Sequence, residues 1–160
     1  LSVTAGGRYN IAQIAMSDDE VRQYLDAERV LNVATIGPSG HPHLVAMWYA
    51  LIDGKVQFWT FAKSQKIVNL RRDPKMTGLV ESGDTYNELK GVELVGSGRI
   101  IDDFERIMHL GRELALLHNG PAALADELLP FIEAQARKRL AVEFEVERVV
   151  SWDHSKITGY

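Results

Sequence analysis

The spacing of hydrophobic residues predicts a helix followed by three strands in the first part of the chain. Ser17 and Glu20 form a Ser-x-x-Glu capping box, after which apolar side chains recur at helical spacing. The pattern then changes to β-branched and apolar runs, separated by the turn sequences Gly-Pro-Ser-Gly at 37–40 and Asp-Gly at 53–54. The predicted elements are a helix over residues 18–28 and strands over residues 30–36, 44–52 and 55–61.

The remainder of the chain predicts three further helices and three further strands. Asp-Pro at 73–74 stops a short helix, and Asn-Gly-Pro at 119–121 separates two longer ones. In the last strand, apolar residues from Leu140 to Val146 alternate with charged residues such as Glu143, so one face is expected to be buried and the other solvated. The predicted elements are helices over residues 64–72, 102–118 and 122–138, and strands over residues 76–81, 88–101 and 139–147.

Six or so strands joined mainly by short turns, with helices appended, predict a closed or nearly closed antiparallel barrel. Closure is favoured because it removes exposed strand edges. A length of 160 residues, with 46% hydrophobic and 25% charged residues, is enough for one sizeable core. We therefore expect a single domain over residues 16–160, preceded by an N-terminal arm or tail at residues 1–15.

Composition and charge exclude several classes of function. The chain has no cysteine, which excludes disulfides, thiolate nucleophiles and iron–sulfur clusters and is compatible with a reducing cytoplasm, where we expect the protein to be located. Its apolar runs are far shorter than the ~20 residues of a membrane span. The net charge of −4 argues against general nucleic-acid binding, so any bound anion should be small.

A local cluster of positive charge stands out against this acidic total. Lys63, Lys66, Arg71 and Arg72 lie within ten residues that contain no acid. Ser64 is at the predicted helix start, where its hydroxyl, the free N–H groups of the first turn and the Lys66 ammonium can converge on one anion, for which a phosphate is well suited. The alternative is that these are ordinary solvated surface cations.

A soft and aromatic group of residues precedes the basic helix in the sequence. Such side chains suit the faces of a flat conjugated ring, although aromatic residues in strands more often belong to the core. The group consists of Met47, Trp48, Tyr49, Phe58, Trp59 and Phe61.

Neither a metal site nor a catalytic side chain is predicted. The histidines lie in loops and on helix faces without a convincing ligand pattern, and we find no Ser/His/Asp arrangement and no acid pair with catalytic spacing. The five histidines are His41, His43, His109, His118 and His154.

These residues carry a family resemblance. Residues 58–74 resemble the phosphate-binding segment of the pyridoxamine-phosphate-oxidase-like flavin and deazaflavin reductase superfamily. Residues 33–43 resemble the first hairpin of that superfamily, and residues 151–156 resemble the ending of many actinobacterial members. The likeness covers residues 18–156, nearly the whole chain.

The resemblance implies a fold, a partner and a set of site residues. The expected fold is the FMN-binding split barrel, a mainly β, antiparallel, Greek-key-like barrel that forms homodimers with two cofactor sites at the interface. Matched by position, the residues expected to hold the cofactor phosphate are Thr60, Ser64, Lys66 and Asn69. Those expected along the ring are Val45, Met47 and Trp48, and those expected to close the site from the partner chain are Trp152, His154 and Lys156.

The resemblance also implies a reaction. True pyridoxamine phosphate oxidases carry Arg-x-His and Arg-Leu-x-Pro segments near the C-terminus, which this chain does not have, so that activity is not expected. The actinobacterial features instead imply a reductase that transfers a hydride between coenzyme F-420, preferred over FMN, and a small unsaturated organic substrate. The alternative is a protein that binds flavin, deazaflavin or haem without turnover.

Overall fold

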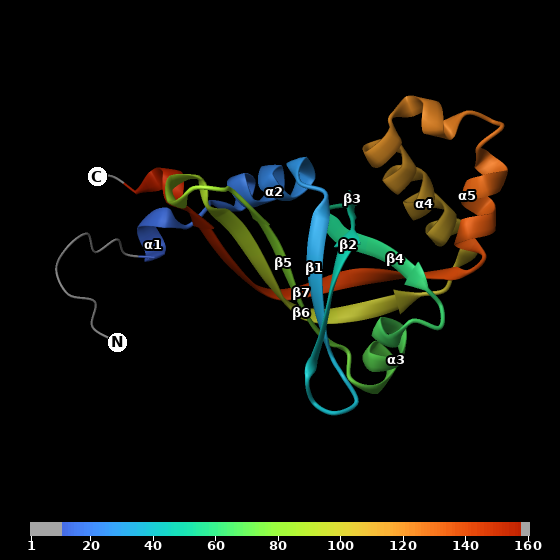
Figure 1. Ribbon diagram of the computed structural model, residues 1–160, viewed down its shortest axis with the longest axis horizontal. Helices are drawn as coiled ribbons and strands as arrows, with labels where there is room; N and C mark the ends of the chain where they lie inside the picture. Colours follow the sequence, from blue (N-terminus) through green and yellow to red (C-terminus); the bar gives the residue numbers. More distant parts are fainter. Residues whose placement is uncertain (1–10, 158–160) are drawn as a thin grey trace.

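Seven antiparallel strands form one strongly curled sheet in the computed structural model, which describes residues 11–157 (Figure 1). Their order across the sheet is β2-β1-β5-β6-β7-β4-β3. The strands are β1 Val30–Ile36, β2 Pro42–Trp48, β3 Ala50–Ile52, β4 Lys55–Phe61, β5 Lys75–Ser82, β6 Lys90–Ile101 and β7 Arg139–Asp153. This architecture confirms the expected antiparallel split barrel with appended helices.

A single residue, Tyr49, connects the two edges of the sheet. β2 and β3 are consecutive in the chain but lie at opposite ends of the strand order, so the sheet has to curl until its edges meet. The Tyr49 side chain is 1% exposed, and its hydroxyl donates a hydrogen bond of 2.5 Å to the carbonyl oxygen of Leu25. The prediction of one strand over residues 44–52 is therefore wrong, because the chain passes there from one edge to the other.

Helices cover the ends and one outer face of the sheet. They are α1 Ile11–Ile14, α2 Asp18–Ala27, α3 Gln65–Arg72, α4 Phe104–Asn119 and α5 Leu129–Ala136, with 3-10 turns η1 Tyr86–Glu88, η2 Pro121–Leu124 and η3 His154–Lys156. The predicted capping box of α2 is present, since Ser17 and Glu20 bind each other's backbone N–H groups. None of the helices in residues 11–157 has the length and apolar character needed to cross a membrane.

The N-terminal segment is described in part. Of the arm or tail expected at residues 1–15, residues 1–10 lie outside the described residues. Residues 11–14 form α1, whose Ile14 is 3% exposed. The backbone N–H of Met16 donates to the hydroxyl of Ser151 at 3.0 Å, which ties this segment to β7.

The continuous helix predicted over residues 122–138 is wrong. The structure has η2, a turn that ends with a hydrogen bond from Leu128 N–H to the Ala125 carbonyl, and then the eight-residue α5. Pro130 explains the break, because proline has no N–H to donate and its ring clashes with the carbonyl four residues earlier. Proline is tolerated only in the first helical turn, which is where Pro130 lies in α5.

The strand β4 contributes to two hydrophobic cores. Phe58 is fully buried in the core inside the barrel, while its neighbour Trp59 packs in a second core between the outer face of the sheet and the helices α4 and α5. This arrangement follows from the alternation of side chains along a strand. β4 therefore lies between two layers and presents residues to both.

The last strand departs from its predicted alternation at two positions. Glu143, expected on the solvated face, is 3% exposed and accepts hydrogen bonds from Lys55 at 3.2 Å, Gln57 at 2.9 Å and Arg106 at 3.0 Å, and also from Arg99. The outer face is thus covered by a charged network around one carboxylate.

Val146, expected to be buried, is 44% exposed. Val146 pairs with Gly96 of β6, and Arg148 pairs with the adjacent Val95. Glu147, between them, is therefore an extra residue in β7 that has no pair in this register. Such a β-bulge interrupts the strict alternation of the two faces.

Glu143→Gln is expected to lower the free energy of unfolding at pH 7 by about 2–4 kcal/mol, because it leaves the surrounding cations without their buried counter-charge. Burial alone raises the pKa of Glu143, but hydrogen bonds from Arg99 and Lys55 outweigh it and hold the pKa below its usual value. This stabilisation is present above about pH 4.3 and is lost as the pH falls through the folded-state pKa. Urea unfolding at pH 7 and at acidic pH measures the difference between the two proteins.

The matched control is Glu145→Gln, which removes a carboxylate that is 42% exposed and binds the same Lys55 and Arg99. It should cost less than about 1 kcal/mol. An equal loss in both variants, or a loss in Glu143→Gln that does not shrink below about pH 4, would contradict the assignment.

Candidate functional site

The helix α3 begins shortly after β4, and none of the side chains in residues 11–157 caps its first turn. Ser64 is the N-cap residue, as predicted, with an extended backbone at φ −68° and ψ 157°. Its hydroxyl does not bind the helix backbone but accepts a hydrogen bond of 3.2 Å from the Thr60 hydroxyl. Ile67 and Leu70 fix the helix against the sheet, at 0% and 3% exposure. The N–H groups of the first turn are therefore open to an acceptor from outside the chain.

Lys66 is the distinctive charge of this site. Its side chain is only 9% exposed, and within residues 11–157 it makes neither a hydrogen bond nor an ion pair. Burial lowers the pKa of Lys66, since desolvation disfavours the ammonium form. The other cations of the cluster, Lys63, Arg71 and Arg72, are exposed. Lys66 is thus a nearly buried cation whose counter-charge is not supplied by the described residues.

Asn69 holds α3 against the first strand. It is fully buried, and its Nδ2 donates to the Thr35 hydroxyl at 3.0 Å while its Oδ1 accepts from Gln65 at 2.8 Å and Arg72 at 3.2 Å. Arg72 also donates to the carbonyl oxygen of Ile36. Sequence reasoning did not identify Thr35 and Gln65, because neither has a local signal that distinguishes it from an ordinary polar residue.

The predicted ring-binding strand is the edge strand β2. Val45 and Met47 are partly buried, whereas Trp48 at its end is 55% exposed. The aromatic group expected beside α3 is divided by the structure: Tyr49 and Phe58 lie in the core, at 1% and 0% exposure. Only part of that group is therefore available to a ligand.

Trp152, His154 and Lys156 lie at the opposite end of the sheet from α3 (Figure 1). Lys156 donates to the Ala15 carbonyl oxygen at 3.0 Å and to Glu20 at 2.6 Å, and the Trp152 ring packs over Gly91, where a Cβ atom would lie 2.1 Å from the ring. Within one protomer these residues do not meet the helix α3. Their contribution from a partner chain stays a prediction.

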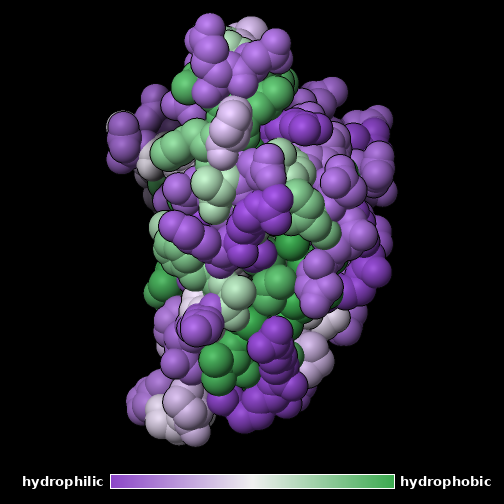
Figure 2. All heavy atoms as spheres, turned by 90° about the vertical axis from the view of Figure 1, so that its right-hand side faces the viewer, coloured by the Kyte–Doolittle hydropathy of each residue, from purple (hydrophilic) through white to green (hydrophobic). Residues whose placement is uncertain are grey.

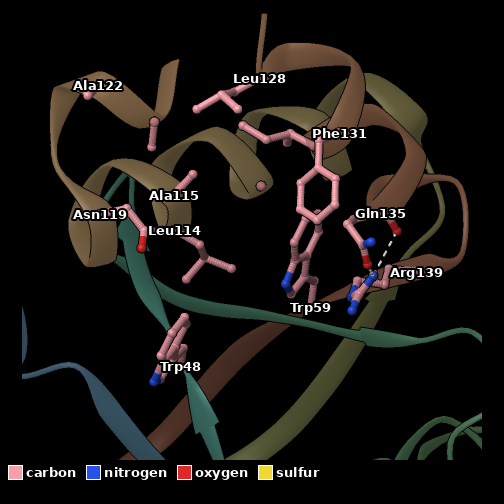
Figure 3. A pocket seen from close by; sticks show the side chains of 13 residues that line it. Trp48, Trp59, Leu114, Ala115, Asn119, Ala122, Leu128, Phe131, Gln135 and Arg139 are labelled. Atoms are coloured by element: carbon pink, nitrogen blue, oxygen red, sulfur yellow. Dashed lines mark hydrogen bonds between the residues drawn. The ribbon is translucent and has the colours of Figure 1, made fainter. Parts of the chain in front are cut away.

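A cavity of about 780 Å³ lies between the outer face of β4 and the helices α4 and α5 (Figure 3). Sequence reasoning did not identify it. The sequence contains one local signal of this cavity, which is Gly111 within a segment that otherwise favours a helix. A Cβ atom at this position would lie 2.6 Å from the Trp59 ring. The lining residues are Trp48, Trp59, Gly111, Leu114, Ala115, Asn119, Ala122, Ala123, Leu128, Phe131, Ile132, Gln135 and Arg139.

The two ends of the cavity differ in character (Figure 3). At one end the Arg139 guanidinium lies 4.9 Å from the Trp59 ring centroid, and its Nη1 donates to the Gln135 carbonyl oxygen at 3.0 Å and to Oε1 at 2.5 Å. Burial lowers the pKa of Arg139. At the other end Trp48 stacks on His118, with ring centroids 3.7 Å apart and an interplanar angle of 10°. The cavity therefore connects a cationic end to the exposed end of β2.

Comparison with known families agrees with this fold. The family model described as pyridoxamine 5'-phosphate oxidase matches residues 17–153. The chain belongs to the pyridoxamine 5'-phosphate oxidase family. Among proteins with curated descriptions, none matches the chain.

Solved structures of this family and fold extend the comparison. A conserved hypothetical protein, Rv2991, from Mycobacterium tuberculosis is 41% identical, with 98% of this chain and 94% of that chain covered and a TM-score of 0.88. A structure described as an F-420 reductase is 21% identical, with 80% and 94% covered and a TM-score of 0.60. HutZ, the haem storage protein from Vibrio cholerae, is 12% identical, with 84% and 94% covered and a TM-score of 0.63. The last two likenesses show the fold alone.

In this member of the pyridoxamine 5'-phosphate oxidase family, Lys66→Met is expected to stabilise the ligand-free protein. The substitution keeps the apolar stem and removes a nearly buried charge that has no partner within residues 11–157. We therefore expect a gain of about 1 kcal/mol, or roughly 2–4 °C in Tm. Thermal unfolding in a buffer free of phosphate measures it. Lys63→Met, at an exposed position of the same cluster, should change stability by less than about 0.5 kcal/mol. A lower Tm for Lys66→Met would show that the ammonium has a favourable partner in the protein.

Proposed function

We propose that this chain is the subunit of a cytoplasmic, homodimeric reductase that uses coenzyme F-420, or else FMN, and acts on a small unsaturated organic molecule. The observation that carries the proposal is the nearly buried Lys66 ammonium beside the uncapped first turn of α3. A protein interior retains such a charge at a cost in stability, which a bound anion offsets. The family, together with the fold shared with a structure described as an F-420 reductase, supports the choice of a redox cofactor.

The residues at the start of α3 fit the phosphate of such a cofactor. The helix dipole and the free N–H groups favour a negative group at this point, and Lys66 supplies a charge-assisted hydrogen bond. Thr60 orients the Ser64 hydroxyl, and Asn69 acts as a positioning residue because it holds α3 on β1. This division of roles assigns direct phosphate contacts to Ser64 and Lys66.

The ring of the cofactor is proposed to lie along the edge strand β2, beside Val45, Met47 and Trp48. When bound, the cofactor supplies the hydride chemistry, so that no protein nucleophile is required. The contribution of the chain is to fix the phosphate, to support one face of the ring and to limit the access of water to it.

Exposed apolar side chains support the homodimer. Leu44 and Trp48 on β2 are 66% and 55% exposed, and Phe61 and Val68 near α3 are 55% and 48% exposed. Figure 2 shows hydrophobic residues gathered among hydrophilic ones, at the height of the end of β4 and of α3. Exposed apolar patches of this kind mark interaction sites. In the proposed dimer, Trp152, His154 and Lys156 of the second copy close the cofactor site.

Titration of the full chain with FMN and with coenzyme F-420 tests the cofactor proposal. We expect F-420 to bind more tightly, and Lys66→Met to weaken binding by about 1.5–3 kcal/mol, or roughly 10- to 150-fold in Kd. Lys63→Met is the matched control and should bind nearly as the wild type does. Unchanged affinity in Lys66→Met would remove the phosphate assignment, and a Soret band in the purified protein would favour a haem-binding function instead.

Turnover is tested with reduced F-420, or reduced FMN, and a panel of enones, quinones and imines. We expect substrate-dependent oxidation of the reduced cofactor, followed at its visible absorption band, with at least one compound. Lys66→Met should raise the concentration of reduced cofactor that half-saturates this reaction by a similar factor, roughly 10- to 150-fold. Tight binding of the reduced cofactor without oxidation by any compound of the panel would indicate a carrier rather than an enzyme.

A further inference from the structure

The cavity under α4 and α5 has the properties of a second binding site, distinct from the phosphate site at α3. We propose that it binds an apolar carboxylate, with the carboxylate group on Arg139 and the hydrocarbon body between Trp59 and the helices. The inference that this acid is the class of substrate rests on the proposed function. The inference that the cavity binds such an acid rests on the cavity alone.

The walls of the cavity are suited to a hydrocarbon body. Its volume of about 780 Å³ is within the range of roughly 300–1,000 Å³ that is usual for small-molecule sites. Most of the lining is apolar, and Phe131 and Leu128 line it although they are 67% and 45% exposed. Figure 3 shows the Phe131 ring directed from α5 toward Trp59. A bound apolar group would cover surface that the chain itself leaves exposed.

The polar end of the cavity selects an anion. Of the described residues that line the cavity, Arg139 alone carries a charge, and it has no carboxylate partner within residues 11–157. Its hydrogen bonds use Nη1 only, so Nη2 and Nε have no acceptor among the same residues. A guanidinium presents its donors in a planar fork that matches a carboxylate. Gln135 and the rings of Trp59 and Phe61 hold this fork in place.

The position of the cavity relates it to the proposed cofactor site. Trp59 and Thr60 are neighbours on β4 and point to opposite faces, so Trp59 lines the cavity while Thr60 binds Ser64. At the far end Trp48 belongs to β2, the strand proposed for the ring. An acid held by Arg139 would therefore extend toward the redox ring, which is the arrangement that a substrate requires.

Calorimetric titration of the full chain with 2-naphthoate, decanoate and the neutral 2-naphthamide tests the site. We expect at least one of the two acids to bind once per chain, and the amide to bind at least about tenfold more weakly than 2-naphthoate, because it forms no ion pair with Arg139. Tighter binding of decanoate would indicate a ligand with an extended hydrocarbon chain, and tighter binding of 2-naphthoate would indicate one with a planar ring. Failure of both acids to bind would overturn the proposal.

Variants separate the cavity from the cofactor site. Arg139→Met should weaken the acid at least about tenfold and leave the amide unchanged, whereas Arg137→Met, whose side chain is exposed and paired with Glu133, should leave both unchanged. Ala115→Phe, which fills the cavity, should abolish both and is checked for folding by circular dichroism. If Arg139→Met does not fold, the same titration is made with Arg139→Lys. We expect this variant to retain part of the affinity for the acid.

Lys66→Met should bind 2-naphthoate as the wild type does, so that loss of the cofactor proposal would leave this site standing. Conversely, if Arg139→Met weakens FMN or F-420 binding as strongly as Lys66→Met does, Arg139 belongs to the cofactor site and the carboxylate proposal is overturned. Unchanged affinity of 2-naphthoate for Arg139→Met would overturn it as well.

Discussion

The one-residue connection at Tyr49 constrains the whole structure. Because β2 and β3 are the two edges of the sheet, a single residue between them forces the sheet to close, and closure creates the inner core. Tyr49 is buried, and its hydroxyl is held by the last turn of α2. Closure also sets Trp48, the last residue of β2, at the rim of the cavity under α4 and α5. The cavity and the proposed ring-binding strand are thus neighbours as a result of how the barrel closes.

The strand β4 links the two proposed ligand sites. Three consecutive residues of β4 contact three different parts of the structure. Phe58 lies in the inner core, Trp59 lines the outer cavity, and Thr60 contacts the start of α3. A rigid strand that is hydrogen-bonded to β3 and β7 on its two sides holds such a relation more accurately than a loop does. The spacing between the two sites is therefore fixed by the geometry of the sheet rather than by flexible segments.

Local signals made much of this fold predictable. The capping box at Ser17, the Asp53-Gly54 hairpin and the helix start at Ser64 each depend on neighbouring residues, and each is present in the structure. The features that were missed depend on distant residues. Glu143 is buried because cations from β4, β6 and α4 converge on it. The crossing at Tyr49 was missed for the same reason, because alternation in one strand does not show which strands lie at the edges.

The phosphate site was accessible to sequence reasoning because its parts are close in the chain. Thr60, Ser64 and Lys66 lie within seven residues, and their spacing already indicates one end of a helix. The cavity was not accessible, because Trp59, Leu114 and Arg139 meet only after α4 and α5 fold onto the sheet. Pro130, by contrast, was a local signal of the break before α5 and was overlooked.

Lys66 has no partner in the part of the chain that the structure describes, which links the binding of an anion to the lifetime of the protein. A ligand that binds only the folded state stabilises it by an amount that grows with the logarithm of its concentration. Chains that have not acquired an anion would therefore unfold more often and reach proteases sooner than loaded ones. A single buried ammonium would in this way make the cellular supply of the ligand a determinant of how much of the protein persists.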